Sequence, residues 1–386
     1  MVELVRAGLS MRKVAQEFGV ALSVVQRWVK RASQQRLERV DWSDRSRASV
    51  RPHNRTSDDL ESLIVNARRD LADCSELGEY GAEAIRAYLI AEDLAQPPST
   101  RTIGRVLERN GVLDSRHRIR RPPPPKGWYL PNVAARRAEV DSFDTVSGLV
   151  IAGGPEVVVL NGISLHGGLV TSWPYTSMTA RLTADLLVDH WHEFGRPTYA
   201  QFDNDTIFQG PHHYPDVVGR VSRTCLQLGV TPVFAPPREP GFQASIESYN
   251  GRWQDKVWAR WIHQNLSDLC DRSKRYVEAA RLRAATRIAS APARLKLPKR
   301  FTIDLQAPPS GIMIFIRRTD DAGRVTLLGR QFLVAPHWSH RLTRVEVNFT
   351  QQSVHIFGLR RREPDVQPLL AVRDYAFPRR PFREYD

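Results

Sequence analysis

Three acidic residues that are far apart in the sequence occupy positions where a carboxylate is unusual. Asp141 lies inside the apolar run AEVDSFD, where burial normally excludes a charge. Asp203 ends the run TYAQFD, and Glu247 lies near the start of a long predicted helix in GFQASIESYNG. Carboxylate oxygens suit Mg²⁺, and two such ions about 4 Å apart support in-line phosphoryl transfer. If these side chains converge, they form a catalytic site for two Mg²⁺ or Mn²⁺ ions.

The surrounding sequence predicts the elements that would bring these acids together. Residues 137–175 contain three β-rich runs separated by Gly or Pro turns, which predicts a three-strand meander. Helical and strand-like segments then alternate up to about residue 265, and this pattern indicates an α/β layer fold. Because neighbouring strand ends converge in such a sheet, carboxylates from two strands and one helix can meet there.

Two further acids compete for the same roles. Asp144 lies on the same stretch of strand as Asp141, and although the flanking residues favour Asp141, the choice between the two stays open. Glu239 precedes Pro240, and a Pro-Gly loop fixes a carboxylate poorly, so Glu247 is preferred as the third acid.

Residues 1–35 predict a helix-turn-helix that binds DNA. Ala15 supplies a small residue where two helices cross, Gly19 supplies the turn, and Val25 and Trp28 anchor the second helix. The opposite face of that helix carries side chains that can reach base edges and phosphates: Ser23, Gln26, Arg27 and Lys30. An ordinary helical hairpin with a charged face is the alternative interpretation.

A second helix-turn-helix-like unit is predicted over residues 56–118. The segment RTIGRVLERNG directs Ile103, Val106 and Leu107 inward. Its outward arginines are candidate DNA contacts: Arg101, Arg105 and Arg109. A Pro- and Arg-rich linker follows over residues 119–134, because consecutive prolines favour an extended conformation.

Closely spaced β-rich runs over residues 300–360 predict a small β-barrel, and a basic tail follows over residues 361–386. The formal net charge of +14 indicates a polyanionic partner, with nucleic acid the first choice. The three cysteines form no CxxC pair, and no apolar run approaches the ~20 residues of a membrane span. We therefore expect a soluble protein in a reducing compartment that contains DNA.

Residues 137–265 resemble the catalytic core of retroviral-integrase-type (DDE) insertion-sequence transposases. AEVDSFD resembles the first acidic motif of that family, QFDNDTIF the second, and PREPGFQASIESYNGRW the third, in which an Asn follows the Glu by three residues. Asp205 departs from the pattern, because the family usually has Gly after Asp-Asn. It either distorts the turn or serves as an extra outer acid.

The resemblance implies a multidomain protein with an α/β RNase H-like catalytic core, here residues 135–290, between all-α helix-turn-helix units and the small β-barrel. It implies a bacterial, cytoplasmic, nucleoid-associated transposase that binds terminal inverted repeats. Such an enzyme cleaves 3′ ends and joins them to target DNA as a dimer or higher oligomer. Residues beside the three acids would orient them or hold substrate and phosphates: Asn204, Asp205, Asn250, Arg252 and Lys256. A catalytically inactive DNA-binding regulator and a structure-selective nuclease are the alternatives.

Overall fold

The computed structural model describes residues 1–43, 56–113, 126–211, 214–239, 241–298 and 300–384. The proline run of the predicted linker, residues 122–125, lies outside the described residues. The chain divides into two compact units, Met1–Leu60 and Glu61–Asp386, which are treated separately below. None of the helices among the described residues has both the length and the apolar character needed to cross a bilayer.

The first unit is helical, as expected for residues 1–35. Its helices are α1 (Val2–Arg6), α2 (Met11–Glu17) and α3 (Leu22–Ala32), followed by the 3₁₀ turn η1 (Leu37–Arg39). The Ser10 side chain accepts a hydrogen bond from the Lys13 amide and caps α2. Gly19 turns the chain between α2 and α3 with a φ of 62°, and Val14, Ala15 and Val25 pack together behind the turn.

Three further helices follow: α4 (Asp58–Cys74), α5 (Ala82–Ala91) and α6 (Thr100–Arg109). Ser99 caps α6, and its apolar face is buried through Ile103, Val106 and Leu107. Both features agree with the alternation of apolar and basic residues in the sequence. The short helix α7 (Pro131–Ala134) leads into the sheet.

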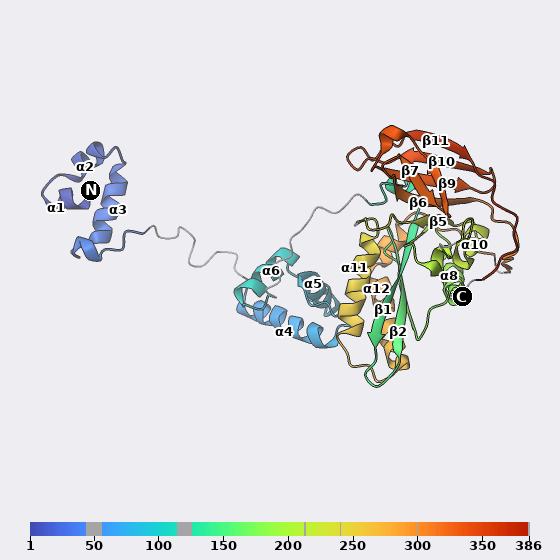
Figure 1. Cartoon of the computed structure of the whole chain (residues 1–386). Coiled ribbons are helices and arrows are strands. Elements are labelled where there is room, and N and C mark those ends of the chain that lie inside the picture. The colour runs from blue at the N-terminus through green and yellow to red at the C-terminus, as the bar shows by residue number, and fades with distance from the viewer. Residues whose placement is uncertain (44–55, 114–125, 212–213, 240, 299, 385–386) are drawn as a thin grey trace. The chain divides into compact units, whose positions relative to one another are not determined.

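One sheet of nine strands organises the second unit, in the order β11-β10-β9-β6-β5-β4-β1-β2-β3. The strands β1 (Val140–Val150), β2 (Glu156–Ser164) and β3 (Val170–Tyr175) form the predicted antiparallel meander. The strands β4 (Tyr199–Phe202) and β5 (Thr231–Phe234) continue the sheet in parallel with β1. The α/β layer fold expected for the core is therefore confirmed (Figure 1).

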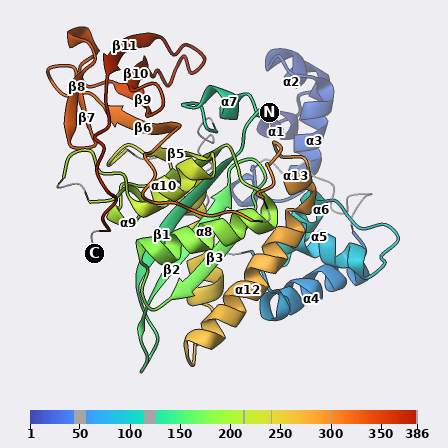
Figure 2. The ribbon, with the colours of Figure 1, turned by 90° about the vertical axis from the view of Figure 1, so that its right-hand side faces the viewer.

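Helices cover both faces of this sheet. The helices α8 (Ala180–Phe194), α9 (Thr206–Gln209) and α10 (Arg220–Gln227) contribute to one buried cluster with Phe143 and Phe202. The helix α11 (Ala244–Trp253), the π-helical turn η2 (Gln254–Trp258) and α12 (Leu266–Arg283) contribute to another with Val157 and Val159. A short α13 (Ala285–Ala289) follows, and α8 and α12 can be traced beside the strands in Figure 2.

The C-terminal strands extend the same sheet, so the separate small β-barrel predicted over residues 300–360 is not confirmed. The strand β6 (Ile312–Arg318) pairs in parallel with β5, with Val233 opposite Ile314 and Phe234 opposite Phe315. Beyond it lie β9 (Leu342–Asn348), β10 (Ser353–Gly358) and β11 (Leu369–Asp374). The strands β7 (Arg324–Leu327) and β8 (Arg330–Leu333) form a separate hairpin before the 3₁₀ turn η3 (Pro336–Trp338). The run IMIFI is apolar at every position, as expected of a strand buried on both faces.

Candidate active site

The register of β1 against β4 decides which acid of β1 lies beside Asp203. Asp141 is paired with Ala200 and Ser142 with Gln201, so continuing the parallel register brings Asp144 level with Asp203. Successive side chains alternate between the faces of a strand. Asp144 therefore lies on the face opposite to Asp141.

Asp144 is held by contacts with its own strand and with α11. The Asn250 side-chain amide donates a hydrogen bond of 2.7 Å to Asp144 Oδ2, and the Thr145 amide donates one of 2.9 Å to Oδ1. Asn250 in turn accepts a hydrogen bond of 2.9 Å from Asn161 on β2. Asn250 thus fixes one acid of β1 to the helix that carries Glu247.

The pKa of Asp144 responds to the charges of two other acids, Asp203 and Glu247. Burial and the negative charge of Asp203 raise the pKa of Asp144 to about 6, and the charge of Glu247 adds to this increase. The hydrogen bonds from Thr145 and Asn250 act in the opposite direction. Among the described residues, no group of three or more His, Cys, Asp or Glu side chains is placed so that it could hold a metal ion. The three carboxylates are therefore close enough to repel one another, although they do not already surround one point.

The turn that carries Asp203 is stabilised by local hydrogen bonds. The Asp205 amide donates to Asp203 Oδ1 at 3.0 Å. The Asp205 side chain caps α9 by accepting from the Ile207 amide at 2.9 Å. The φ of Asp205 is −61°, so its backbone does not need a glycine. Asp205 therefore does not distort the turn, and its carboxylate is engaged as a helix cap.

The Asn204 side chain makes hydrogen bonds to β6 and to the residue that follows β5. Its amide nitrogen donates to the Ala235 carbonyl at 2.8 Å, and its oxygen accepts from Arg317 at 2.7 Å. Ala235 follows β5 and Arg317 lies in β6. Asn204 thus joins the end of β4 to the next two strands. Arg317 lies beside the candidate site, and the sequence analysis did not predict it.

Glu247 lies in the first turn of a firmly anchored helix. Ile246, Tyr249 and Trp253 are buried on the sheet side of α11. The Tyr249 hydroxyl lies 2.7 Å from Ser172 Oγ, and the Trp253 ring nitrogen donates to Ser273 Oγ at 3.0 Å. The side chains of Glu247 and Asn250 lie one turn apart on the same helix face.

The competing acid Glu239 is engaged elsewhere. Arg318 forms an ion pair with it, and the guanidinium of Arg361 lies 3.7 Å from its carboxylate. Glu239 is thus engaged by two arginines, and Glu247 stays the predicted third acid.

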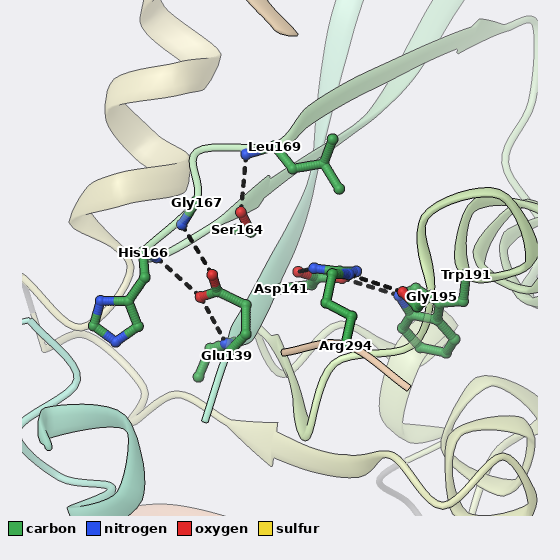
Figure 3. A network of polar contacts seen from close by, with 10 residues as sticks. Glu139, Asp141, Ser164, His166, Gly167, Leu169, Trp191, Gly195 and Arg294 are labelled. Carbon is green, nitrogen blue, oxygen red and sulfur yellow. Dashed lines mark hydrogen bonds and ion pairs between the residues drawn. The ribbon is translucent and has the colours of Figure 1, made fainter. Parts of the chain in front are cut away.

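Asp141 does not converge with Asp203 and Glu247, and this expectation is corrected. Its side chain is buried at 1% exposure. Arg294 holds both of its oxygens, at 2.8 and 2.5 Å, and the Trp191 ring nitrogen donates to it at 3.0 Å (Figure 3). The nearby carboxylate of Glu139 accepts hydrogen bonds from the His166 and Gly167 amides. The physical reason is that successive side chains alternate between the two faces of a strand. Asp141 and Asp144 are three positions apart on β1, so they face opposite sides of the sheet.

The candidate DNA-contacting residues remain largely exposed. On α3 these are Ser23, Gln26, Arg27 and Lys30, and on α6 they are Arg101 and Arg105. Arg109 is also exposed, but it forms an ion pair with Glu61, so it already has a carboxylate partner. On and after α11, Arg252 is exposed, and the Lys256 amine lies 5.7 Å from the ring of Tyr80.

The raised pKa of Asp144 has a consequence for the stability of the metal-free protein. A folded-state pKa of about 6 against an ordinary 3.8 means that ionised Asp144 destabilises the fold, progressively as the pH rises from about 4 to above 6. Asp144→Asn removes this penalty. We expect the variant to be more stable than wild type by roughly 1–2 kcal/mol at pH 8 and equally stable at pH 4. Urea unfolding in EDTA at both pH values checks this, and a difference that does not change with pH would contradict it.

No protein-family model matches the sequence, and no curated protein matches it. Solved structures do match. The catalytic core domain of BIV integrase is 16% identical, with 37% of this chain and 80% of that chain covered and a TM-score of 0.27. A chain of the simian T-cell lymphotropic virus intasome in complex with PP2A regulatory subunit B56 gamma is 13% identical, with 67% and 87% covered and a TM-score of 0.32. The HTLV-2 integrase catalytic core domain in complex with magnesium is 12% identical, with 37% and 83% covered and a TM-score of 0.27. Sequence identities and TM-scores this low do not establish a shared function. The side chains of the candidate site are therefore the basis for the proposed function.

Proposed function

We propose that this protein is a metal-dependent polynucleotidyl transferase that cleaves and joins DNA, with Asp144, Asp203 and Glu247 as its metal-binding acids. The observation that carries the proposal is the placement of these acids: the strand register brings Asp144 level with Asp203, and Asn250, one turn after Glu247 on α11, donates a hydrogen bond to Asp144. Grouped anionic oxygens suit Mg²⁺ or Mn²⁺, because a divalent cation relieves their repulsion. When bound, two such ions activate the attacking oxygen and stabilise the leaving oxygen.

The chain's own residues position these acids. Asn250 holds Asp144 by a hydrogen bond of 2.7 Å. The Asp205 amide holds Asp203, while the buried face of α11 fixes the helix that carries Glu247. Arg252 lies one turn after Asn250, where its exposed guanidinium can bind a backbone phosphate. The protein thereby orients both acids and substrate without a covalent nucleophile.

The finer function that we propose is that of a transposase. The two helical units would bind the terminal inverted repeats of a mobile element, and the core would cleave the 3′ ends and join them to target DNA. Two ends must be brought together for this reaction, so we propose a homodimer or higher oligomer on DNA. The net charge of +14 and the exposed basic residues of α3 and α6 support a DNA partner.

The metal site can be tested without DNA. Millimolar Mn²⁺ or Mg²⁺ is expected to raise the melting temperature of the wild-type protein, because binding to the folded state alone stabilises it. The double variant Asp144→Asn/Asp203→Asn is expected to lose this response, while the surface control Asp365→Asn keeps it. Differential scanning calorimetry with and without each cation measures the shift. An equal shift in the double variant would place the metal elsewhere.

The DNA-reading role of α3 gives a separate prediction. Arg27→Ala is expected to weaken binding to duplex DNA and to reduce the slope of log affinity against log salt by ~1, because one phosphate contact is lost. Fluorescence anisotropy with a mixed-sequence duplex between about 50 and 200 mM salt measures this slope. Arg39→Ala, an exposed arginine outside α3, is the matched control. If both variants behave alike, α3 is not the DNA-contacting helix.

A further inference from the structure

A cavity of about 320 Å³ lies beside the turn that follows Asp203. Residues after β4 line one side of it, and the β7–β8 hairpin and β6 line the other. Six of its lining residues matter here: Asn204, Gln209, Tyr214, Val217, Arg317 and Leu327. This volume is at the lower end of the range for small-ligand sites, roughly 300–1,000 Å³. The cavity is therefore large enough for one small organic group.

Arg317 gives this cavity a buried positive charge. The residue is 9% exposed, and its guanidinium donates to the Asn204 side chain and to the carbonyls of Ala235 and Ile316. These acceptors are neutral oxygens, and within the described part of the chain no carboxylate forms an ion pair with it. A buried charge without a counter-charge is costly, so this position favours an anionic group from outside the protein.

Gln209 also lines this cavity, and its Oε1 is an unused hydrogen-bond acceptor buried behind the cavity wall. The residue is 6% exposed, and its Oε1 has no hydrogen-bond partner among the residues that the structure describes. Buried polar atoms are nearly always paired, because a missing hydrogen bond costs free energy. Rotation of the Gln209 side chain would turn this oxygen into the cavity, where a ligand N–H donor would remove that cost.

The remaining walls are apolar and suit a flat ring. Val217, Pro237, Leu327 and Leu328 line the cavity, and Tyr214, which is 53% exposed, lines it as well. Apolar walls, one acceptor and one cation together match a nucleobase with an amino group and an attached phosphate. Aromatic rings also stack on bases regardless of sequence.

We propose that this cavity binds a single unpaired nucleotide of the DNA strand, with the base amino group toward Gln209 Oε1 and the phosphate toward Arg317. The inference rests on the proposed function, since it takes DNA as the substrate. Asn204 links the cavity to the active site, because it contacts Arg317 and directly follows Asp203. A nucleotide held here would leave the duplex next to the reacting phosphate and fix the position of the cut.

Binding of free mononucleotides to the full chain tests this cavity. The probes are dCMP and dAMP in EDTA, observed by saturation-transfer NMR, with deoxyribose 5-phosphate as the probe that lacks a base. We expect saturable binding of both nucleotides and none of the sugar phosphate. Gln209→Leu is expected to weaken binding about tenfold, the effect of losing one buried hydrogen bond. Val217→Phe fills the cavity and is expected to abolish binding.

Gln331→Leu, at an exposed position on β8 outside the cavity lining, is the matched control and should bind as wild type does. Melting temperatures of all variants confirm that they are folded. Absent nucleotide binding, or equal binding by Val217→Phe and wild type, overturns the assignment. Metal-dependent nicking by the same preparations tests the proposed function independently. Nicking without nucleotide binding removes only the cavity assignment, and nucleotide binding without nicking removes only the catalytic function.

Discussion

Asp144→Asn and Asp203→Asn are each expected to abolish metal-dependent DNA cleavage while leaving DNA binding nearly intact. Loss of an outer-shell partner of a metal typically costs roughly 10–100-fold in affinity or activity, so loss of a direct ligand is expected to cost more than about a hundredfold. Asparagine keeps the shape and one oxygen of the side chain and removes its charge. In the wild type, Asp144 accepts hydrogen bonds from Thr145 and Asn250, and the Asp144→Asn side chain keeps one of the two because it has a single acceptor oxygen.

A nicking and strand-joining assay on supercoiled DNA measures this effect, and anisotropy measures DNA binding in parallel. Asp365→Asn, on the exposed C-terminal segment, controls for the substitution itself. Full cleavage by Asp144→Asn would remove that residue from the site. If the wild-type chain binds DNA but does not cleave it, the result would instead support the alternative of a catalytically inactive DNA-binding regulator.

The largest expected effect on stability comes from the Asp141–Arg294 pair. Arg294→Met is expected to destabilise the protein by about 3–5 kcal/mol, because it leaves the buried Asp141 charge without its counter-ion. The Arg294 side chain is also only 13% exposed, so solvent cannot replace it freely. The double variant Asp141→Asn/Arg294→Met is expected to recover part of the loss, since it removes both charges (Figure 3).

Urea unfolding followed by tryptophan fluorescence measures these differences, and Trp191, which contacts Asp141, reports on the site directly. Arg272→Met, which removes a part-exposed pair with Asp268, is a matched control and is expected to cost less than about 1 kcal/mol. A cost of similar size for Arg294→Met would show that the Asp141 pair is not the buried anchor described here.

Much of the architecture follows directly from the sequence. Gly and Pro turns between β-rich runs predict the meander, and Ser10 and Ser99 predict the starts of α2 and α6 through their capping hydrogen bonds. These predictions succeed because turns and caps are local. The joining of β6 to β5 depends on pairing between residues about eighty positions apart, which no local pattern specifies.

For the first acid of the proposed site, the sequence itself contains a signal that distinguishes Asp144 from Asp141. The runs DSFD and QFD both place an aspartate directly after a phenylalanine. Phe143 and Phe202 stack in the core with ring centroids 5.9 Å apart, so the acids that follow them face the opposite side together. Because Asp144 and Asp203 each follow a buried phenylalanine by one position, they face the same side of the sheet. This favours Asp144 over Asp141 as the first acid of the proposed site. The role of Asp141 could not be read in the same way, because Arg294 is 153 residues away in the chain.

The pairing of β6 with β5 limits how short an independently folding fragment of this protein can be. A chain shortened to residue 290 would lack β6 and would leave β5 as an unpaired edge strand, which is prone to aggregation. It would also lack Arg294 and Arg317, the two cations that contact Asp141 and Asn204. Recombinant fragments intended for crystallography or kinetics therefore have to reach at least the end of β11, near Asp374. The C-terminal strands are therefore not a separable module, because they belong to the sheet that carries the proposed site.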